Sequence, residues 1–322
     1  MLKRGFLGVM APIILLICFA VIMGVAVDEA LAKEKKNITI ILWHILKPSE
    51  ESFKRVVEKV YDVNWTEVSA GQSKEKLEEI LKSIDPAKTD LVYSYGTTVA
   101  LATKKTIKDI PIVFNIVYDP IGAGVINSWE HSGSNIVGGS IKVSPEAQLK
   151  ALRMIVNFKK LGVLCNPKEK QAVLGVEEFK ALQDKFGYTI VVADFSSLEE
   201  LNNAMRVFDE AKVDAVMCTS ASMILTNAEA VANALIERKL PALSPVIEVA
   251  QKGVFMGLGA NYANLGEKVG EIALKVLAGE KPNDIRSVTL EKFDMIVNLK
   301  SANKMGTAVP EKVLKLATEI IK

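Results

Sequence analysis

The sequence predicts an α/β protein built from two similar domains, on the basis of three observations. Residues 73–98 and 197–222 align without a gap at an offset of 124, with eight identical positions. Each copy reads as a capped helix, a short linker, an apolar strand and a loop of small hydroxyl residues. Strands alternate with helical patterns of ~10–15 residues, which is typical of βαβ units and a parallel sheet. A repeat this long indicates two domains, because solenoids repeat every ~20–50 residues.

Apolar runs and turn residues predict the elements in chain order. Strands are expected at 37–43, 90–93, 111–117, 160–165, 189–192, 214–218, 241–244, 254–258 and 295–298. Helices are expected to begin at Pro48, Ser73 and Gly96, to contain Val176–Phe186, to span 222–239 and 265–277, and to begin again at Pro310. Ser197 and Glu200 have the spacing of a capping box for a further helix. This order repeats across the two halves.

Composition and charge narrow the class of protein. The chain has 322 residues, enough for two domains of ~100–200 residues each, and a hydrophobic fraction of 49% provides for two cores. The net charge is only +2, without a basic stripe that carries interleaved aromatic residues, which argues against nucleic-acid binding. Two histidines and three cysteines supply few ligands for a metal site. We therefore expect no metal and no cofactor.

The N-terminus predicts export. Lys3 and Arg4 precede an apolar run at 12–27, and a small-residue cleavage pattern ends at Ala32. The run is shorter than the ~20 residues that a membrane span needs. We expect a signal peptide at 1–32 and a periplasmic or extracytoplasmic mature chain, with an uncleaved anchor as the alternative.

The three cysteines are expected to be unmodified. Cys18 follows two large apolar residues, so a lipid-modified cysteine is not expected there. Cys165 and Cys218 end two strands that are neighbours in a doubly wound sheet. A disulfide is conceivable in an oxidising compartment, but adjacent parallel strands rarely offer the required geometry. We predict two free, half-buried thiols.

Small polar residues follow the predicted strands and precede the predicted helices. In an open parallel sheet ligands bind beyond the carboxyl ends of the strands, and helix N-termini favour anionic groups. The alternative is that residues such as Thr98 and Ser222 only cap helices. The candidate ligand-binding residues are Trp43, His44, Ser94, Tyr95, Gly96, Thr97, Thr98, Tyr118, Asp119, Asn166, Thr219, Ser220, Ser222 and Glu248.

The sequence gives little support for an enzyme. It has no glycine-rich dinucleotide or phosphate loop, no G-x-S-x-G turn and no histidine-containing metal motif. His131 lies in a turn-like stretch, and His44 at a strand end has no visible acid–base partner. We expect no catalytic residue.

Residues 90–140, DLVYSYGTTVALATKKTIKDIPIVFNIVYDPIGAGVINSWEHSGSNIVGGS, resemble the signature region of ABC-transporter substrate-binding proteins of the tryptophan/tyrosine type. The similarity continues through LGVLCNPKE, VDAVMCTSAS and LGEKVGEIALKVLAGEKPNDI to the closing helix. The resemblance implies a type I periplasmic-binding-protein fold, in which two Rossmann-like lobes joined by a hinge close on a solute. It also implies a monomer that docks on an ABC permease with its ATPase subunit.

The resemblance also implies a division of the chain and of the site. We expect lobe I to hold 33–143 plus about 260–290, and lobe II to hold 144–259 plus about 291–322. Lobe I would contribute the loop from Ser94 to Thr98, with Asp119 at the hinge side. Lobe II would contribute Asn166 and the loop from Thr219 to Ser222.

The chain departs from the family pattern where related proteins often place acids. Ala221 stands in place of an aspartate, and Val246-Ile247 in place of an acidic pair. Lys47 replaces the histidine of a His-Pro pair. Only Asp119 and Glu248 remain nearby to receive an ammonium group, which is expensive to bury unpaired. We therefore expect an anionic or neutral solute with an apolar or aromatic part.

Two other functions are considered for a chain with these sequence features. A ligand sensor of the same fold that feeds a signalling receptor would need an identical cleft, because fold does not fix function. An exported α/β enzyme is the third class, and the missing pair of nucleophile and base argues against it.

Overall fold

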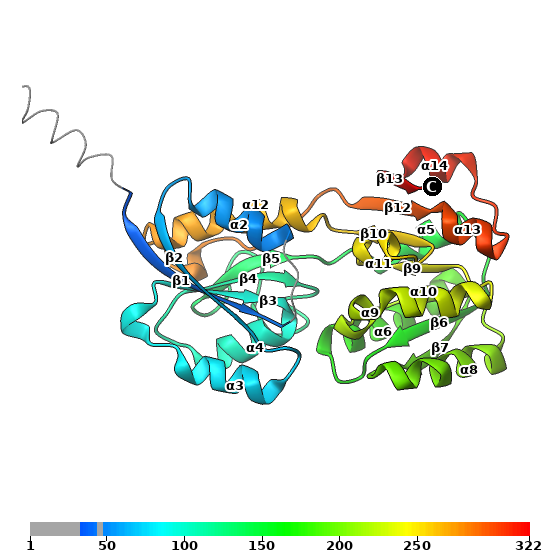
Figure 1. The fold of residues 1–322 in the computed structure, drawn as a ribbon, viewed down its shortest axis with the longest axis horizontal. Coiled ribbons are helices and arrows are strands. Elements are labelled where there is room, and N and C mark those ends of the chain that lie inside the picture. Colours follow the sequence, from blue (N-terminus) through cyan, green and yellow to red (C-terminus); the bar gives the residue numbers. More distant parts are fainter. Residues whose placement is uncertain (1–32, 44–47) are drawn as a thin grey trace, which may run out of the picture.

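The computed structural model describes residues 33–43 and 48–322. The predicted signal peptide at 1–32, with Cys18, lies outside the described residues, and so do His44 and Lys47. Two sheets form the centres of two lobes that lie side by side (Figure 1). This confirms the predicted α/β fold with two lobes. Within the described segments, no helix is both long enough and apolar enough to cross a bilayer.

Lobe I is a six-stranded sheet whose strand pairs are all parallel. In spatial order the strands are β11 (Val288–Thr289), β5 (Ile136–Ser140), β4 (Ile112–Val117), β3 (Leu91–Tyr95), β1 (Lys35–Leu42) and β2 (Asp62–Ser69). The helices are α2 (Pro48–Val57), α3 (Lys74–Ser83), α4 (Gly96–Thr106) and α12 (Tyr262–Leu277), with short 3₁₀ turns at Pro86–Lys88 and Pro282–Asp284. Figure 1 shows α2 and α12 on one face of this sheet and α3 and α4 on the other.

Alternation along β1 explains why both faces are covered. Ile38 and Ile40 belong to the apolar cluster that includes α2 and α12, whereas Ile41 belongs to the cluster under α3 and α4. All three side chains are buried. Successive side chains of a strand point to opposite faces, so a continuous apolar run needs a helix on each side.

Lobe II is a seven-stranded sheet in which only β10 and β12 pair antiparallel. In spatial order the strands are β13 (Glu319–Ile321), β12 (Asp294–Asn298), β10 (Met256–Gly259), β9 (Ala242–Ser244), β8 (Ala215–Cys218), β6 (Lys160–Cys165) and β7 (Thr189–Asp194). The helices are α5 (Pro145–Arg153), α6 (Lys170–Ala181), α7 (Gln183–Phe186), α8 (Leu201–Ala211), α9 (Ser222–Thr226), α10 (Ala228–Glu237), α11 (Ile247–Gln251), α13 (Leu299–Met305) and α14 (Glu311–Leu316), with a 3₁₀ turn at Leu198–Glu200.

The chain passes between the two sheets three times. Consecutive strands change sheet between β5 and β6, between β10 and β11, and between β11 and β12. Between the second and third passages, α12 packs against α2 and contacts β4 and β5 of lobe I. The residues at which the lobes divide stay a prediction.

Some local predictions were wrong. The edge strand β2 was not predicted, because its polar side chains are mostly exposed and leave no apolar run. The helix predicted at 222–239 is two helices that meet at Asn227, whose side-chain amide donates to the Met223 carbonyl. The capping box does not form, because the Glu200 carboxylate accepts from the amide and hydroxyl of Ser196.

Cys165 and Cys218 are free, as predicted, but both are buried rather than half-buried. They end the neighbouring strands β6 and β8, in which Leu164 lies opposite Cys218. Burial raises the pKa of each thiol to about 12, so both stay protonated at neutral pH. These side chains are part of the lobe II core.

Candidate functional site

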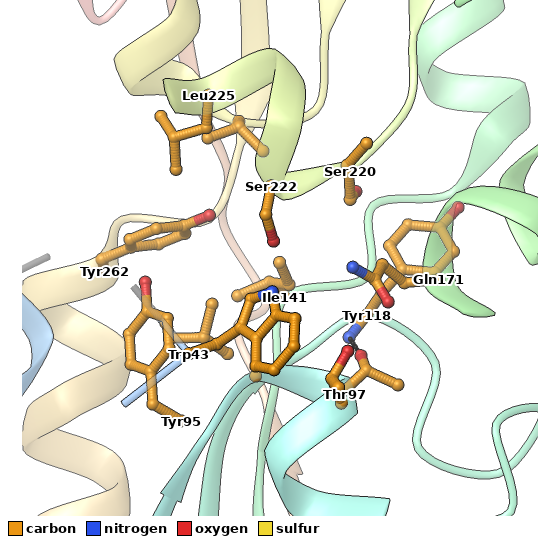
Figure 2. A pocket seen from close by; sticks show the side chains of 15 residues that line it. Trp43, Tyr95, Thr97, Tyr118, Ile141, Gln171, Ser220, Ser222, Leu225 and Tyr262 are labelled. Atoms are coloured by element: carbon orange, nitrogen blue, oxygen red, sulfur yellow. Dashed lines mark hydrogen bonds between the residues drawn. The ribbon is translucent and has the colours of Figure 1, made fainter. Parts of the chain in front are cut away.

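A pocket lies between the two lobes, and residues of both lobes line it. Figure 2 shows Ser220, Ser222 and Leu225 on one side and Trp43, Tyr95 and Thr97 on the other. The full lining is Trp43, Tyr95, Gly96, Thr97, Thr98, Ile116, Tyr118, Ile141, Gln171, Ser220, Ala221, Ser222, Leu225, Val246 and Tyr262.

The lobe I wall begins at the N-terminus of α4. The turn from β3 needs a left-handed residue, which Gly96 provides with φ of 84°. Tyr95 is the N-cap and makes no side-chain capping hydrogen bond, and the first turn holds no acidic residue. The backbone N–H groups of the first turn have no partner within a helix. Since Gly96, Thr97 and Thr98 line the pocket, this terminus is suited to a carboxylate.

A strained residue continues this wall at the end of β4. Ile116 has φ of 58°, a conformation that β-branched residues rarely adopt. The pairing of β4 with β5 shifts register between Phe114 and Val117, and the Asn115 Oδ1 atom accepts from the Ile116 N–H at 2.8 Å. Such strain costs about 1–3 kcal/mol and gathers at ligand sites. The bulge brings Ile116 to the pocket.

The lobe II wall is organised by one buried acid behind it. Glu169 is 6% exposed and accepts from the Gln171 Nε2 atom at 2.5 Å and from the Ser222 N–H at 2.9 Å. Two pocket atoms, the Gln171 Oε1 and the Ser220 Oγ, have no hydrogen-bond partner within the described residues. Buried polar atoms are nearly always paired in proteins. A polar ligand in this pocket would satisfy both.

Four aromatic residues give the pocket its flat apolar surfaces: Trp43, Tyr95, Tyr118 and Tyr262. Burial is the main cause that raises the tyrosine pKa values well above their usual range. The three hydroxyls therefore stay protonated and can donate hydrogen bonds. In Figure 2 Tyr95 and Tyr262 lie next to each other at one end of the pocket, and the Tyr262 hydroxyl is directed toward the side of Ser222.

Two carboxyl groups lie behind this aromatic end but do not line the pocket. Burial raises the pKa of Glu50 to about 8 and that of Glu248 to about 7. After burial itself, the charges of both groups contribute to the raised pKa values of Tyr95 and Tyr262. One oxygen of each has no hydrogen-bond partner among the described residues. At pH 7 Glu50 is therefore mostly protonated, and Glu248 is about half protonated.

The structure brings together eight of the residues that the sequence suggested. They line the pocket and are Trp43, Tyr95, Gly96, Thr97, Thr98, Tyr118, Ser220 and Ser222. Helix capping does not explain Thr98 or Ser222, because the N-caps of α4 and α9 are Tyr95 and Ala221. Their roles as ligand contacts stay a prediction.

Five other candidates lie beside the pocket rather than in its lining. Ser94 is fully buried in β3, and Thr219 donates its hydroxyl to the Leu164 carbonyl. The Asn166 side-chain amide donates a hydrogen bond to Glu169 at 2.8 Å. The Asp119 carboxylate accepts a hydrogen bond from the Gly122 N–H and forms an ion pair with Lys142. Glu248 lies behind the aromatic end, as described above. His44 belongs to the part that the structure does not describe.

Sequence reasoning missed Gln171, Tyr262 and Glu169. Tyr262 follows the end of β10 at the start of α12, so the strand-end argument could have found it. Gln171 and Glu169 follow β6 at the start of α6, and a search limited to the residues just after each strand does not reach them. No sequence pattern marked Ile116 or Ile141 as a pocket residue, because apolar residues within or beside strands are expected to belong to the hydrophobic core.

Comparisons with solved structures place this fold among known binding proteins. The chain superimposes with a TM-score of 0.82 on an ABC domain from Streptococcus pneumoniae in complex with L-Trp, at 24% identity over 90% of this chain and 100% of that one. It superimposes with a TM-score of 0.70 on the ligand-free, open structure of a substrate-binding protein with adhesive properties from Clostridium difficile, at 26% identity over 90% and 99% of the two chains.

Comparisons of sequence agree with the fold. A tyrosine-binding protein of Clostridioides difficile (strain R20291) is 30% identical over 212 residues, which are 66% of this chain and 61% of that protein. This chain thus aligns with less than two thirds of that relative's length. The family described as ABC transporter substrate binding protein matches residues 50–321. The lobed fold, the cleft between the lobes and this match agree: the chain belongs to the family of ABC transporter substrate-binding proteins.

Proposed function

We propose that this chain is the extracytoplasmic solute-binding subunit of an ABC importer, and that its solute has an aromatic body and a carboxylate. The observation that carries the proposal is the pocket itself. Uncapped N–H groups at the α4 terminus and unpaired polar atoms at Gln171 and Ser220 surround a space walled by aromatic rings. The N–H groups at the start of α4 are suited to binding a carboxylate, and the aromatic rings are suited to packing against a flat apolar body.

The relatives support an aromatic solute. One similar structure holds L-Trp, and one similar protein is named for tyrosine binding. Both solutes join an aromatic ring to a carboxylate, which is the pairing that the pocket favours.

The ammonium group of an amino acid is the part that this pocket serves least well. No described residue of the lining is acidic. Glu50 and Glu248 are the acids behind the aromatic end. Burial raises their pKa values to about 8 and about 7, so Glu50 is mostly neutral at pH 7 and Glu248 carries only part of a full charge. Burying an unpaired ammonium is expensive. We therefore propose that an aromatic carboxylate without the ammonium binds more tightly than the free amino acid.

Export and partnership are further parts of the proposal. The charged N-terminal residues, the apolar run and the cleavage pattern at Ala32 favour a secreted mature chain that begins at Lys33. Mass spectrometry of the protein recovered from its native compartment should find that N-terminus. A lipid-modified Cys18 would contradict it. We also propose that the protein is a monomer. The family supports an ABC permease with its ATPase subunit as its partner.

A ligand screen tests the proposed solute class. Thermal shift and calorimetry should compare L-tryptophan, L-tyrosine and L-phenylalanine with indolepropionate, hydroxyphenylpropionate and phenylpropionate. A ligand at 100 times its dissociation constant stabilises the protein by about 2.7 kcal/mol, a shift of a few degrees. Tight binding of the amino acids with no response to the deaminated analogues would show that an ammonium is recognised. No response to any of the six would reject the aromatic class.

A further inference from the structure

Four charged and aromatic side chains join the two lobes beside the pocket. Tyr118 and Asp119 follow β4 in lobe I, Lys142 follows β5 at the first crossing, and Glu178 lies on α6 in lobe II. We refer to Tyr118, Asp119, Lys142 and Glu178 as the closure cluster. Its members meet only because α6 lies against the lobe I side of the cleft, where it contacts α4.

Glu178 is the member that crosses between the lobes. Its Oε2 accepts from the Tyr118 hydroxyl at 2.6 Å, and its Oε1 lies 2.5 Å from the Lys142 Nζ. Hydrogen bonds in which one partner is charged are about twice as strong as neutral ones. The side chains of Glu178 and Lys142 are 24% and 29% exposed, so solvent screens these contacts only in part.

Tyr118 and Lys142 are held on lobe I by separate contacts. The Tyr118 carbonyl accepts from the Ser140 hydroxyl at 2.9 Å. Lys142 pairs with Asp119 at 2.6 Å, and its backbone N–H donates to Ser140. Burial lowers the pKa of the Lys142 ammonium, but its hydrogen bonds to Asp119 and Glu178 outweigh that effect and raise it overall. When the lobes separate, Glu178 loses both partners and the Tyr118 hydroxyl loses Glu178, whereas Lys142 keeps Asp119.

Tyr118 couples this cluster to the pocket. It lines the pocket, and Figure 2 shows its hydroxyl directed away from the pocket centre. The same side chain therefore presents surface to a solute while its far end is fixed by lobe II. The better superposition on the L-Trp complex than on the open, ligand-free structure, 0.82 against 0.70, fits lobes in the closed arrangement.

We infer that Glu178 is an affinity-determining residue of this binding protein: its bonds to Tyr118 and Lys142 hold the lobes closed over the solute. The role of Glu178 in capturing a solute rests on the proposed function. A contact made only in the closed form raises the closed fraction, and apparent affinity rises by the same factor. Because the contact breaks on opening, its loss acts mainly on the rate of release.

The test uses Glu178→Gln, Tyr118→Phe and the double variant, with Glu177→Gln as the matched control. Glu177 is the neighbour on the same helix, is 62% exposed and pairs only along α6 with Lys180 among the described residues. L-tryptophan, L-tyrosine and the deaminated analogues named above serve as probes in stopped-flow and calorimetric measurements. Small-angle scattering of the ligand-free proteins reports lobe separation without any solute.

We expect Glu178→Gln to release bound probe about five- to tenfold faster and to weaken affinity by a similar factor, within the usual range of such coupling. Tyr118→Phe should act in the same direction, and the double variant should fall short of the product of the two single effects. Glu177→Gln should match the wild type, and all melting temperatures should stay close. Equal release rates for Glu178→Gln and the wild type would overturn the inference.

Scattering separates this inference from the proposed function. If none of the probes binds the wild type, the proposed solute class is wrong. Scattering of the ligand-free proteins then still tests the role of Glu178. A larger radius of gyration for Glu178→Gln than for the wild type and Glu177→Gln would then support it. Identical radii in that case would reject it.

Discussion

At the scale of single residues, the pocket is a set of neutral hydrogen-bonding groups that buried polar side chains hold in place. Glu169 fixes Gln171 and the Ser222 amide, and Asn115 fixes the strained Ile116. In each case the residue that touches the pocket is positioned by one that does not. This leaves the pocket polar but uncharged, which is why the backbone of α4 becomes its main site for an anion.

The hydroxyl of Thr98 is expected to contact the solute. Thr98→Ala should weaken binding of the tightest probe by about tenfold, since a hydrogen bond to a charged group is worth ~1.5–3 kcal/mol. Calorimetry measures the change, and Thr106→Ala at the exposed end of the same helix is the control. An unchanged affinity with a lowered melting temperature would instead assign Thr98 to helix stability.

The buried acid Glu50 should make stability depend on pH. Burial raises its pKa from the usual 4.5 to about 8, so the folded chain binds this proton more tightly than the unfolded chain does. Its contribution is therefore complete below pH 4.5 and is lost as the pH rises toward 8. Glu248, raised to about 7, acts in the same direction.

Thermal melts between pH 5 and pH 8 measure this effect. The wild-type melting temperature should fall by more over this interval than that of Glu50→Gln, because glutamine stays neutral and keeps an acceptor for the Tyr93 hydroxyl. Glu51→Gln, at the exposed neighbouring position, should follow the wild type. Parallel curves for Glu50→Gln and the wild type would show that Glu50 is ionised in the folded protein.

The candidate site was predictable in part at this scale. Thr97, Thr98 and Ser220 follow strands of a parallel sheet, and the general rule for such sheets places ligands there. Gln171 and Glu169 come from the beginning of a helix, and their positions depend on how that helix packs. Ile116 reaches the pocket through a bulge that depends on the Asn115 side chain. No sequence pattern specifies such a bond between side chain and backbone.

At the scale of elements, close contact between α2 and α12 ties the C-terminal helix of lobe I to its first helix. A Cβ atom added at Gly266 would lie 2.2 Å from the Ser49 carbonyl oxygen, and one at Gly270 would lie 2.7 Å from Val56. Both glycines are therefore required by space rather than by backbone conformation. Ser49 also bonds to Tyr93 and Asn115, so this contact supports the buried network under the pocket.

Gly266→Ala should therefore destabilise the protein by about 1–3 kcal/mol, because backbone cannot yield as a flexible side chain can. Gly175→Ala in α6 is the matched control. There the nearest atom, the Thr219 Cγ2, lies 3.7 Å from the added Cβ, and removing a helical glycine should stabilise by about 0.5–1 kcal/mol. Denaturant melts distinguish the two, and equal effects of both substitutions would contradict this account of the α2–α12 contact.

The sequence predicted most elements because most strands are buried on both faces and read as apolar runs. The strands that were not predicted are β2, β5, β11 and β13. β2 is an edge strand that needs no apolar run and takes its register from β1, and β5 is buried but contains two glycines. The helices α5, α11 and α13 and the break at Asn227 were not predicted either. Pairing with β1 decided the case of β2, and the local bond from the Asn227 amide to the Met223 carbonyl accompanies the break.

At the scale of the whole molecule, two sheets and three crossings create one pocket from distant parts of the chain. Trp43 and Tyr262 are separated by most of the sequence, yet both line it. The internal repeat predicted two domains, and the resemblance to a known family predicted that they close on a solute. The sequence alone does not specify how the lobes are arranged, because contacts such as Tyr118 to Glu178 join residues that are distant in the chain.

A crystal structure of the complex with the tightest-binding probe tests the central claim most directly. We predict that the solute lies between the lobes, with its carboxylate at the N-terminus of α4 near Thr97 and Thr98. Its other polar groups should reach Ser220 and Gln171, and its ring should lie among Trp43, Tyr95 and Tyr262. A solute bound within one lobe, or with its carboxylate turned toward Glu248, would contradict this account.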